Sequence, residues 1–292
     1  MPLAFVRKAV PFLLDQYARE RAHPVRSAAH RPEPKAWGDK GLHAAWLGHS
    51  TVLLKIDGIT VLTDPVFSSR IGVNLGPATV GPRRLVAPAL GLGELPCPDL
   101  ILLSHAHMDH FDIPSLRALE SAKTRVVTAA RTSDLLRVRR YGTVRELGWG
   151  EATHLGEMTI RAFEVRHWGA RMRTDTWRGY NGYVIETANH RVIFGGDTAM
   201  TDTFRSLRSL RRTDLALMPV GAYNPWLHAH CTPEQALQMA DDAGAQRILP
   251  IHHQTFRLSS EAYLEPIERL SAALGNSQDR LVLSRIGQEI SI

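Results

Sequence analysis

Short apolar runs separated by turn residues recur along the chain and predict a fold rich in β-strands. Residues 52–63 predict a β-hairpin, because two runs of apolar and β-branched residues flank an Asp-Gly turn. Residues 183–194 predict a second hairpin of the same kind. The first hairpin runs into Asp64 and the second into Asp197, so the pattern suggests two related halves.

Strands alternate with helices along the rest of the chain, which favours an α/β fold. The clearest helix begins after Thr232, an N-cap residue type followed three positions later by Gln235, and it ends at Gly244. No linker-like stretch interrupts residues 44–292, so we predict one domain there, after a lead-in or cover segment over residues 1–43. The remaining predicted strands cover residues 100–103, 126–129, 159–165, 215–220 and 247–251, and the remaining helices cover residues 113–120 and 133–140.

The composition excludes several protein classes. With 292 residues and 44% hydrophobic residues the chain can bury a sizeable core, and no apolar run reaches the ~20 residues of a membrane span. The chain has only two cysteines, so a disulfide framework is not expected and a reducing, cytoplasmic location is favoured. The net charge of +6 leans toward a small-molecule or lipid-like anionic substrate. The scattered arginines are interpreted as solvated helix faces, so no nucleic-acid partner is expected.

The first 14 residues are apolar but contain Arg7 and Lys8. A secretory signal places its positive charge before an unbroken apolar stretch, so this pattern favours a short amphipathic cover segment instead. The alternative is a membrane-surface anchor, which would give the protein a peripheral membrane contact.

The segment from Ser104 to His110 carries the strongest chemical signal. It directly follows the predicted buried strand over residues 100–103, and loops at strand ends are where α/β proteins place reactive groups. Imidazole nitrogens and carboxylate oxygens suit zinc and neighbouring divalent metals. The four candidate ligands in the segment are His105, His107, Asp109 and His110.

Other residues of the same types follow other predicted strands. If these strand ends converge, they would form a site for two divalent ions, with zinc expected and manganese or iron as alternatives. The residue types alone give His252 only a slight preference over His253. One ion would be held by His105, His107 and His167, the second by Asp109, His110 and His252, and Asp197 would bridge the two.

From residue 46 onward these landmarks resemble the metallo-β-lactamase fold superfamily. The sequence is most similar to the branch that contains N-acylphosphatidylethanolamine-hydrolysing phospholipase D and its bacterial relatives. The resemblance implies a four-layer αββα sandwich of two mixed β-sheets flanked by helices, and it selects His252 over His253 as the ligand. It is carried by Trp46-Leu47-Gly48-His49-Ser50-Thr51, Leu62-Thr63-Asp64-Pro65, Gly81-Pro82-Arg83-Arg84, Pro219-Val220-Gly221-Ala222-Tyr223 and Tyr263-Leu264-Glu265-Pro266.

The resemblance implies a dinuclear metal-dependent hydrolase, with a phosphodiesterase of phospholipase D-like type as the first choice. A hydroxide that bridges the two ions would attack the substrate. Asp109 would orient the attacking water and act as the base. Asp64 would orient a ligand histidine through a hydrogen bond.

Further candidates concern the substrate. His230 matches a histidine near the reaction centre of the phospholipase-like branch, so we assign it to substrate binding or to protonation of the leaving group. Tyr223 is a candidate substrate-binding residue, as a donor to an oxyanion or phosphate. His49 and His228 are interpreted as surface histidines.

Two alternatives to a phosphodiesterase stay open. The same centre suits a lactonase or another carboxylic ester hydrolase, and a non-enzymatic metal-binding protein could keep the fold. Residues 170–178 and the His253-Gln254 pair depart from the phospholipase pattern, so the resemblance does not select a substrate. A nuclease of the RNA-processing type is disfavoured, because such enzymes carry a large insertion and only about 30 residues separate His167 from Asp197.

Overall fold

Two mixed β-sheets form the centre of the protein in a computed structural model, which describes residues 20, 24–74, 79–136, 140–172, 174–209 and 211–292. The larger sheet has seven strands in the order β15-β1-β2-β3-β6-β7-β8. Its strands are β1 (Leu42–Gly48), β2 (Thr51–Ile56), β3 (Ile59–Thr63), β6 (Leu100–Leu103), β7 (Arg125–Ala129), β8 (Thr143–Leu147) and β15 (Glu289–Ser291).

The second sheet has six strands in the order β14-β13-β12-β11-β10-β9. A separate two-stranded ribbon pairs β4 (Val73–Asn74) with β5 (Thr79–Val80). The strands of the second sheet are β9 (Ala152–Leu155), β10 (Met158–Phe163), β11 (Gly182–Glu186), β12 (Arg191–Phe194), β13 (Thr213–Pro219) and β14 (Ala245–Ile251).

Both sheets repeat one strand pattern. In the first, β1, β2 and β3 are antiparallel and β6 and β7 then run parallel to β3. In the second, β10, β11 and β12 are antiparallel and β13 and β14 run parallel to β12. The parallel strands of each sheet therefore end at a common edge, where α/β folds collect functional side chains.

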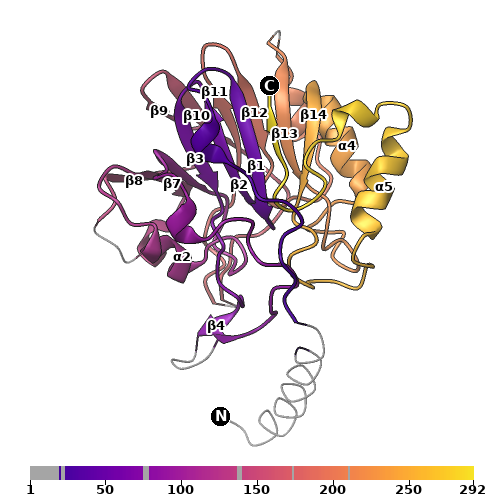
Figure 1. The fold of residues 1–292 in the computed structure, drawn as a ribbon, viewed down its shortest axis with the longest axis horizontal. Coiled ribbons are helices and arrows are strands. Elements are labelled where there is room, and N and C mark those ends of the chain that lie inside the picture. Colours follow the sequence, from indigo (N-terminus) through magenta and orange to yellow (C-terminus); the bar gives the residue numbers. More distant parts are fainter. Residues whose placement is uncertain (1–19, 21–23, 75–78, 137–139, 173, 210) are drawn as a thin grey trace, which may run out of the picture.

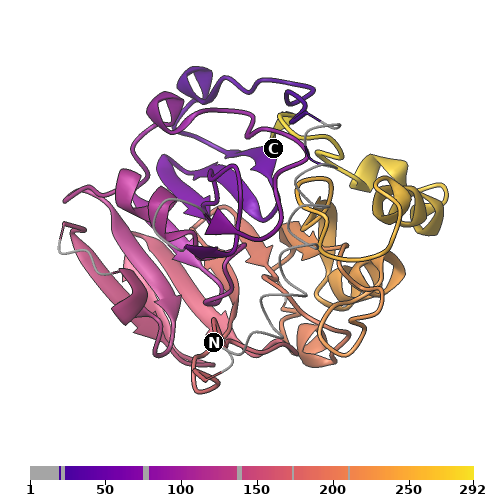
Figure 2. The ribbon, with the colours of Figure 1, turned by 90° about the horizontal axis from the view of Figure 1, so that it is seen from below.

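Apolar side chains fill the space between the sheets, among them Leu53, Leu102, Tyr183, Leu217 and Leu249. A second apolar cluster joins the outer face of β12, β13 and β14 to the helices. Figure 1 shows α4 (Pro233–Asp242) and α5 (Glu265–Leu274) beside this face, and Figure 2 shows both helices at one side of the molecule. The structure also describes two short α-helices, α2 (Ile113–Ala118) and α3 (Thr203–Ser206). The structure thus confirms an α/β fold with two mixed sheets.

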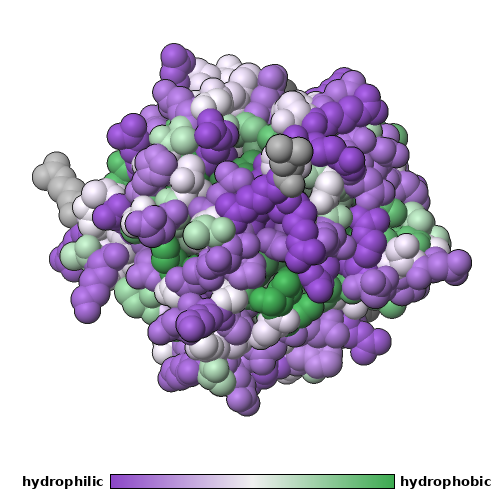
Figure 3. Space-filling view, turned by 90° about the horizontal axis from the view of Figure 1, so that it is seen from above, coloured by the Kyte–Doolittle hydropathy of each residue, from purple (hydrophilic) through white to green (hydrophobic). Residues whose placement is uncertain are grey.

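The end opposite the strand-end loops carries polar turns. Asp57 closes the β2–β3 hairpin and accepts a hydrogen bond from the hydroxyl of Thr187, in the turn between β11 and β12. In Figure 3, which views the molecule from above, hydrophilic residues predominate and hydrophobic residues form small separate groups. Among the described residues, no helix is long and apolar enough to cross a membrane.

Most predicted elements are present with small changes at their ends. Both hairpins, the strands and α2 are found, and α4 begins with the predicted capping box between Thr232 and Gln235. Within the predicted helix over residues 133–140, Ser133–Leu136 forms a 3₁₀ turn instead of an α-helix, and residues 137–139 lie outside the described residues. The sequence analysis missed β1, β4, β5, β8, β9, β15, α3 and α5. The predicted cover segment over residues 1–14 lies outside the described residues.

Candidate metal centre

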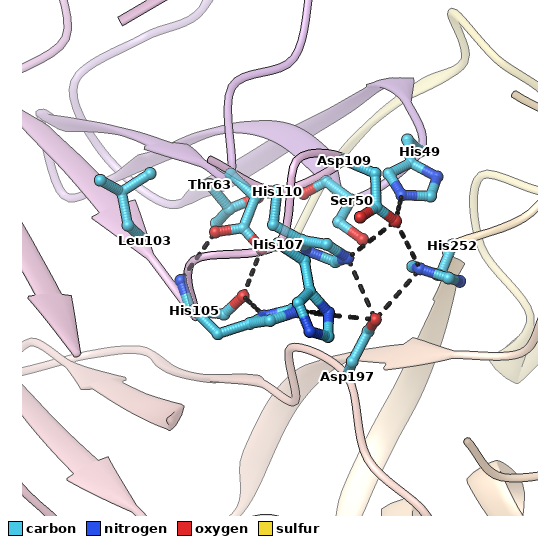
Figure 4. A network of polar contacts seen from close by, with 12 residues as sticks. His49, Ser50, Thr63, Leu103, His105, His107, Asp109, His110, Asp197 and His252 are labelled. Carbon is cyan, nitrogen blue, oxygen red and sulfur yellow. Dashed lines mark hydrogen bonds and ion pairs between the residues drawn. The ribbon is translucent and has the colours of Figure 1, made fainter. Parts of the chain in front are cut away.

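Strand ends from both sheets bring the candidate ligands together (Figure 4). His105 follows β6, His252 follows β14, and the other ligands lie in loops. In the loop after β6, the N–H groups of His110 and Phe111 both donate to the carbonyl of His107, at 3.1 and 2.8 Å. This tight turn folds the loop back, so that His107 and His110 each lie in a group with His105, and Asp109 lies in a group with His110.

A glycine lets the second sheet approach the first at this point. Gly196, two residues after β12, has a φ of +58°, and a Cβ added there would lie 2.9 Å from the Cβ of Ser104. Only glycine adopts this conformation and this closeness without strain. Asp197 therefore reaches the loop that follows β6.

The first group consists of His105, His107, His167 and Asp197. Nδ1 of His107 lies 2.8 Å from Nε2 of His105 and 3.2 Å from Nε2 of His167. Oδ2 of Asp197 lies 4.0 Å from Nε2 of His105 and 3.8 Å from Nε2 of His167. Three ring nitrogens and one carboxylate oxygen thus surround one point.

The second group consists of Asp109, His110 and His252, again with Asp197. Oδ2 of Asp109 lies 3.5 Å from Nε2 of His110 and 3.3 Å from Nε2 of His252. Oδ2 of Asp197 lies 3.1 Å from each of these two nitrogens. The same oxygen of Asp197 therefore belongs to both groups.

The donor set fits divalent metal ions. Ligands ~2.0–2.1 Å from a tetrahedral zinc ion lie about 3.3 Å from one another, and the spacings within the two groups run from 2.8 to 4.0 Å. Nε2 of His110 is buried without a hydrogen-bond partner among the described residues, as expected for a nitrogen that binds a metal. Neutral imidazoles whose lone pairs converge would repel one another, and a cation between them removes that repulsion.

Burial and neighbouring charges set the protonation of the centre. Burial opposes protonation of His252, but the carboxylates of Asp197 and Asp109 outweigh it and raise its pKa to about 9. Burial also opposes ionisation of Asp197, but His110 and His252 hold its pKa well below its usual value. Burial and the adjacent His110 hold the pKa of His105 well below its usual value. Metal binding would displace the protons of the second group, so metal affinity should fall as the pH falls.

Hydrogen bonds from neighbouring groups orient the ligand rings. Oδ2 of Asp64 accepts from Nδ1 of His110 at 2.6 Å, which turns Nε2 of that ring toward the centre. Asp64 is fully buried and also accepts from the N–H and the hydroxyl of Ser104. Nδ1 of His167 donates to the carbonyl of Ala229 at 2.9 Å. The loop before α4 therefore helps to fix a ligand of the first group.

His230 faces the centre from this same loop. Its Nδ1 lies 3.9 Å from Oδ2 of Asp197, and the atom is buried without a hydrogen-bond partner among the residues that the structure describes. Burial lowers the pKa of His230 to about 4. The ring is therefore neutral at neutral pH.

The structure also places the three other histidine and tyrosine candidates, of which only His228 lies in the surroundings that were predicted. His49 is not a surface histidine, because it is 1% exposed and its Nε2 lies 3.0 Å from Oδ2 of Asp109. His228 is exposed, as predicted. The hydroxyl of Tyr223 donates to Oε1 of Glu265 at 2.6 Å. The predicted role of Tyr223 as a donor to substrate would require this bond to break.

Aromatic side chains that the sequence analysis did not single out border the centre. The indole of Trp168 lies 4.8 Å from the ring of His107 and 4.5 Å from the ring of His167. On the neighbouring loop the ring of Trp226 lies 6.0 Å from that of His228. Trp168, Trp226 and Leu227 are 41%, 45% and 54% exposed, so the rim offers apolar surface to a substrate.

Arg171 holds both ends of the loop after β6. Its Nη1 donates to the carbonyl of Ala106 at 3.0 Å and to that of Phe111 at 2.8 Å. These carbonyls flank the turn that presents Asp109 and His110, so the guanidinium stabilises the ligand geometry.

We expect Arg171→Ala to weaken metal binding roughly 10–100-fold, the usual cost of losing a group that orients metal ligands. Competition against a chromophoric chelator measures the affinity. The control is Arg166→Ala, because the side chain of Arg166 is exposed. Equal affinities for the two variants would exclude this role for Arg171.

Comparison with known proteins agrees with the fold and the site. Residues 60–253 match a family model described as Beta-lactamase superfamily domain. The chain belongs to the beta-lactamase superfamily. The matched region includes every candidate ligand from both groups, and it identifies the chain as a metal-dependent hydrolase of this superfamily.

Individual relatives show which members of the superfamily this chain is similar to. An uncharacterized protein of Mycobacterium tuberculosis is 34% identical over 258 residues, which span 85% of this chain and 68% of the relative. N-acyl-phosphatidylethanolamine-hydrolyzing phospholipase D 1 of Caenorhabditis elegans is 30% identical over 259 residues, which span 82% of this chain and 72% of the relative. The isothiocyanate hydrolase from Delia radicum gut bacteria superposes with a TM-score of 0.68, covers 86% of this chain and 98% of its own, and shares 18% identity. That likeness shows the superfamily fold alone.

Proposed function

We propose that the protein is a dinuclear metal-dependent phosphodiesterase of phospholipase D-like type. The observation that carries the proposal is the shared position of Asp197, whose Oδ2 lies 3.1 Å from the facing nitrogens of both His110 and His252 and within 4.0 Å of those of His105 and His167. A carboxylate between two ions keeps them at the short separation that two-metal hydrolysis uses. The similarity to the Caenorhabditis elegans phospholipase supports a phosphodiester as the bond that is broken.

The chain's own residues supply orientation and proton transfer. When bound, two divalent ions, with zinc expected, would activate a water molecule and polarise the phosphoryl group. Burial opposes ionisation of Asp109, but His110 and the other histidines hold its pKa well below its usual value, so the side chain is a carboxylate that can orient the water. Its position beside the ions makes it the base of the proposed mechanism. An anionic phosphodiester beside His230 would raise the low pKa of this ring, which could then pass a proton to the leaving oxygen.

The surroundings support an anionic substrate with an apolar part. Trp168 offers exposed apolar surface next to the ligand histidines, Trp226 and Leu227 are exposed on the neighbouring loop, and the chain carries a net charge of +6. Apolar surface at the rim would bind the apolar part, while the ions would bind the phosphate.

Purified protein loaded with zinc or manganese tests the proposal on a panel of a diester, a monoester, a lactone and an N-acyl phospholipid. We expect diester hydrolysis, and we expect Asp109→Asn to lower kcat at least about 10²–10⁴-fold, because the variant loses both the general base and a ligand of the second ion. The control is Asp202→Asn, because Asp202 lies on the surface with its side chain 81% exposed. Lactone turnover without diester turnover would reject the phosphodiesterase and favour an ester hydrolase.

A further inference from the structure

His49 lies in the turn between β1 and β2, in a conformation that non-glycine residues seldom adopt. Its φ is +52°. Its N–H donates to Oγ1 of Thr255 at 2.6 Å, and its carbonyl accepts from Nε1 of Trp46 at 2.8 Å and from the N–H of His252 at 3.1 Å. Strained backbone that is held this firmly is typical of functional sites.

The ring of His49 faces the second group of ligands. Figure 4 shows its Nε2 directed at Oδ2 of Asp109, 3.0 Å away. The same oxygen faces Nε2 of His110 and Nε2 of His252. Because His110 donates its Nδ1–H to Asp64, a neutral His110 ring presents a lone pair to the centre and cannot donate to Asp109.

The surroundings of His49 select one tautomer. Its Nδ1 is buried and has no hydrogen-bond partner in the described part of the chain. A proton on Nδ1 would leave a buried donor unpaired and would turn the Nε2 lone pair toward a carboxylate. A proton on Nε2 pairs with Asp109 and leaves only an acceptor unpaired, which costs less. The neutral ring is therefore a donor to Asp109.

Asp109 needs such a restraint more than its neighbours do. Its side chain is 15% exposed, whereas those of His110 and His252 are at most 1% exposed. Packing alone holds the two rings, but a partly exposed carboxylate can rotate unless a donor fixes it.

We propose that His49 is a positioning residue of the second metal site, which fixes Oδ2 of Asp109 between His110 and His252 through its Nε2–H. The proposal rests on the two-ion centre of the proposed function but not on its substrate. Metal binding therefore tests it without any assay of hydrolysis. A direct ligand role for His49 is the competing outcome.

The experiment titrates the metal-free full-length protein with Co²⁺, followed by visible absorption and calorimetry. The second site is the one whose absorption band is lost in Asp109→Asn. We expect His49→Ala to weaken this ion roughly 10–100-fold and to leave the other ion unchanged. His49→Gln, whose side-chain amide can place a donor near the position of Nε2, should recover most of the affinity.

His253 provides a matched control for the loss of a buried imidazole. It is 4% exposed, stacks on Trp46 at 4.5 Å and has its Nε2 3.2 Å from the carbonyl of Pro250. We expect His253→Ala to lower the unfolding temperature as much as His49→Ala does and to keep both metal affinities. The proposal would be overturned if both variants weakened metal binding at the second site equally, or if His49→Ala did not weaken it. If His49→Gln did not recover the Co²⁺ affinity and its Co²⁺ absorption band changed shape, His49 would be a direct ligand. A wild-type protein that binds fewer than two ions would reject the two-ion function itself.

Discussion

Replacing Asp197 by alanine is expected to remove both metal ions at once. Its Oδ2 is the atom shared by the two groups, 3.1 Å from Nε2 of His110 and of His252 and 3.8 Å from Nε2 of His167. Loss of a group that only orients a ligand weakens metal binding about 10–100-fold, so loss of a shared ligand should cost more than 100-fold at both sites.

Elemental analysis after dialysis measures this loss directly. We expect close to two ions per chain in the wild-type protein and less than one in Asp197→Ala, with hydrolysis lost in parallel. The matched control is Asp214→Ala. Asp214 is also a buried aspartate, but it accepts the N–H of Arg191 in β12, outside both ligand groups. Retention of one full ion in Asp197→Ala would show that Asp197 serves a single site.

The candidate ligands could be singled out from the sequence because of the residues that precede them. A short apolar run marks a buried strand, and a histidine or aspartate directly after it has few structural reasons to be there. His105 and His252 follow this rule closely, since each is the first or second residue past its strand. Convergence of the strand ends could only be assumed from sequence, because it depends on how the two sheets pack.

His49 was misassigned because its strand was not recognised. Alanines at positions 44 and 45 lower the strand signal of β1, and without that strand the Gly48-His49 turn resembles a surface loop. Its burial depends on contacts with Thr255 and His252, more than 200 residues along the chain. Such long-range contacts leave no periodic signal in a single sequence.

Tyr223 shows a different limit of the sequence. The sequence presents it beside a loop with candidate chemistry, but its partner Glu265 lies on α5, which was not predicted. The type of a residue determines which hydrogen bonds its side chain can make. Whether the side chain is free to bind a substrate depends on which neighbouring groups it already contacts. For this reason the candidate ligands were easier to single out than candidate residues around a substrate.

The two halves of the fold give their equivalent aspartates different tasks. Asp64 follows the hairpin of the first sheet and Asp197 follows that of the second. Oδ2 of Asp197 faces several ligand histidines. Asp64 is fully buried behind His110, and of the described histidine rings only that of His110 donates a hydrogen bond to it. A mutation of Asp64 should therefore affect one ion and the stability of the fold, and a mutation of Asp197 should affect both ions.

Asp64→Asn tests this division. The carboxylate accepts the N–H of Ser104 on Oδ1 at 2.7 Å, and on Oδ2 it accepts the hydroxyl of Ser104 at 2.5 Å and Nδ1 of His110 at 2.6 Å. An asparagine has one acceptor oxygen, so its NH₂ group must face one of these donors. We expect the metal-free variant to lose roughly 1–3 kcal/mol of unfolding free energy through a buried unsatisfied group.

The same substitution frees Nδ1 of His110 and lets the ring rotate, so the ion of the second group should bind about 10–100-fold more weakly while the first is unaffected. Denaturant unfolding of the metal-free protein and Co²⁺ titration measure the two effects separately. Asp99→Asn is the control, because Asp99 accepts one N–H from Thr60 in the same sheet but is exposed and remote from the ligands. Equal weakening of both ions by Asp64→Asn would mean that Asp64 supports the whole centre, because the loop after β6 carries ligands of both groups.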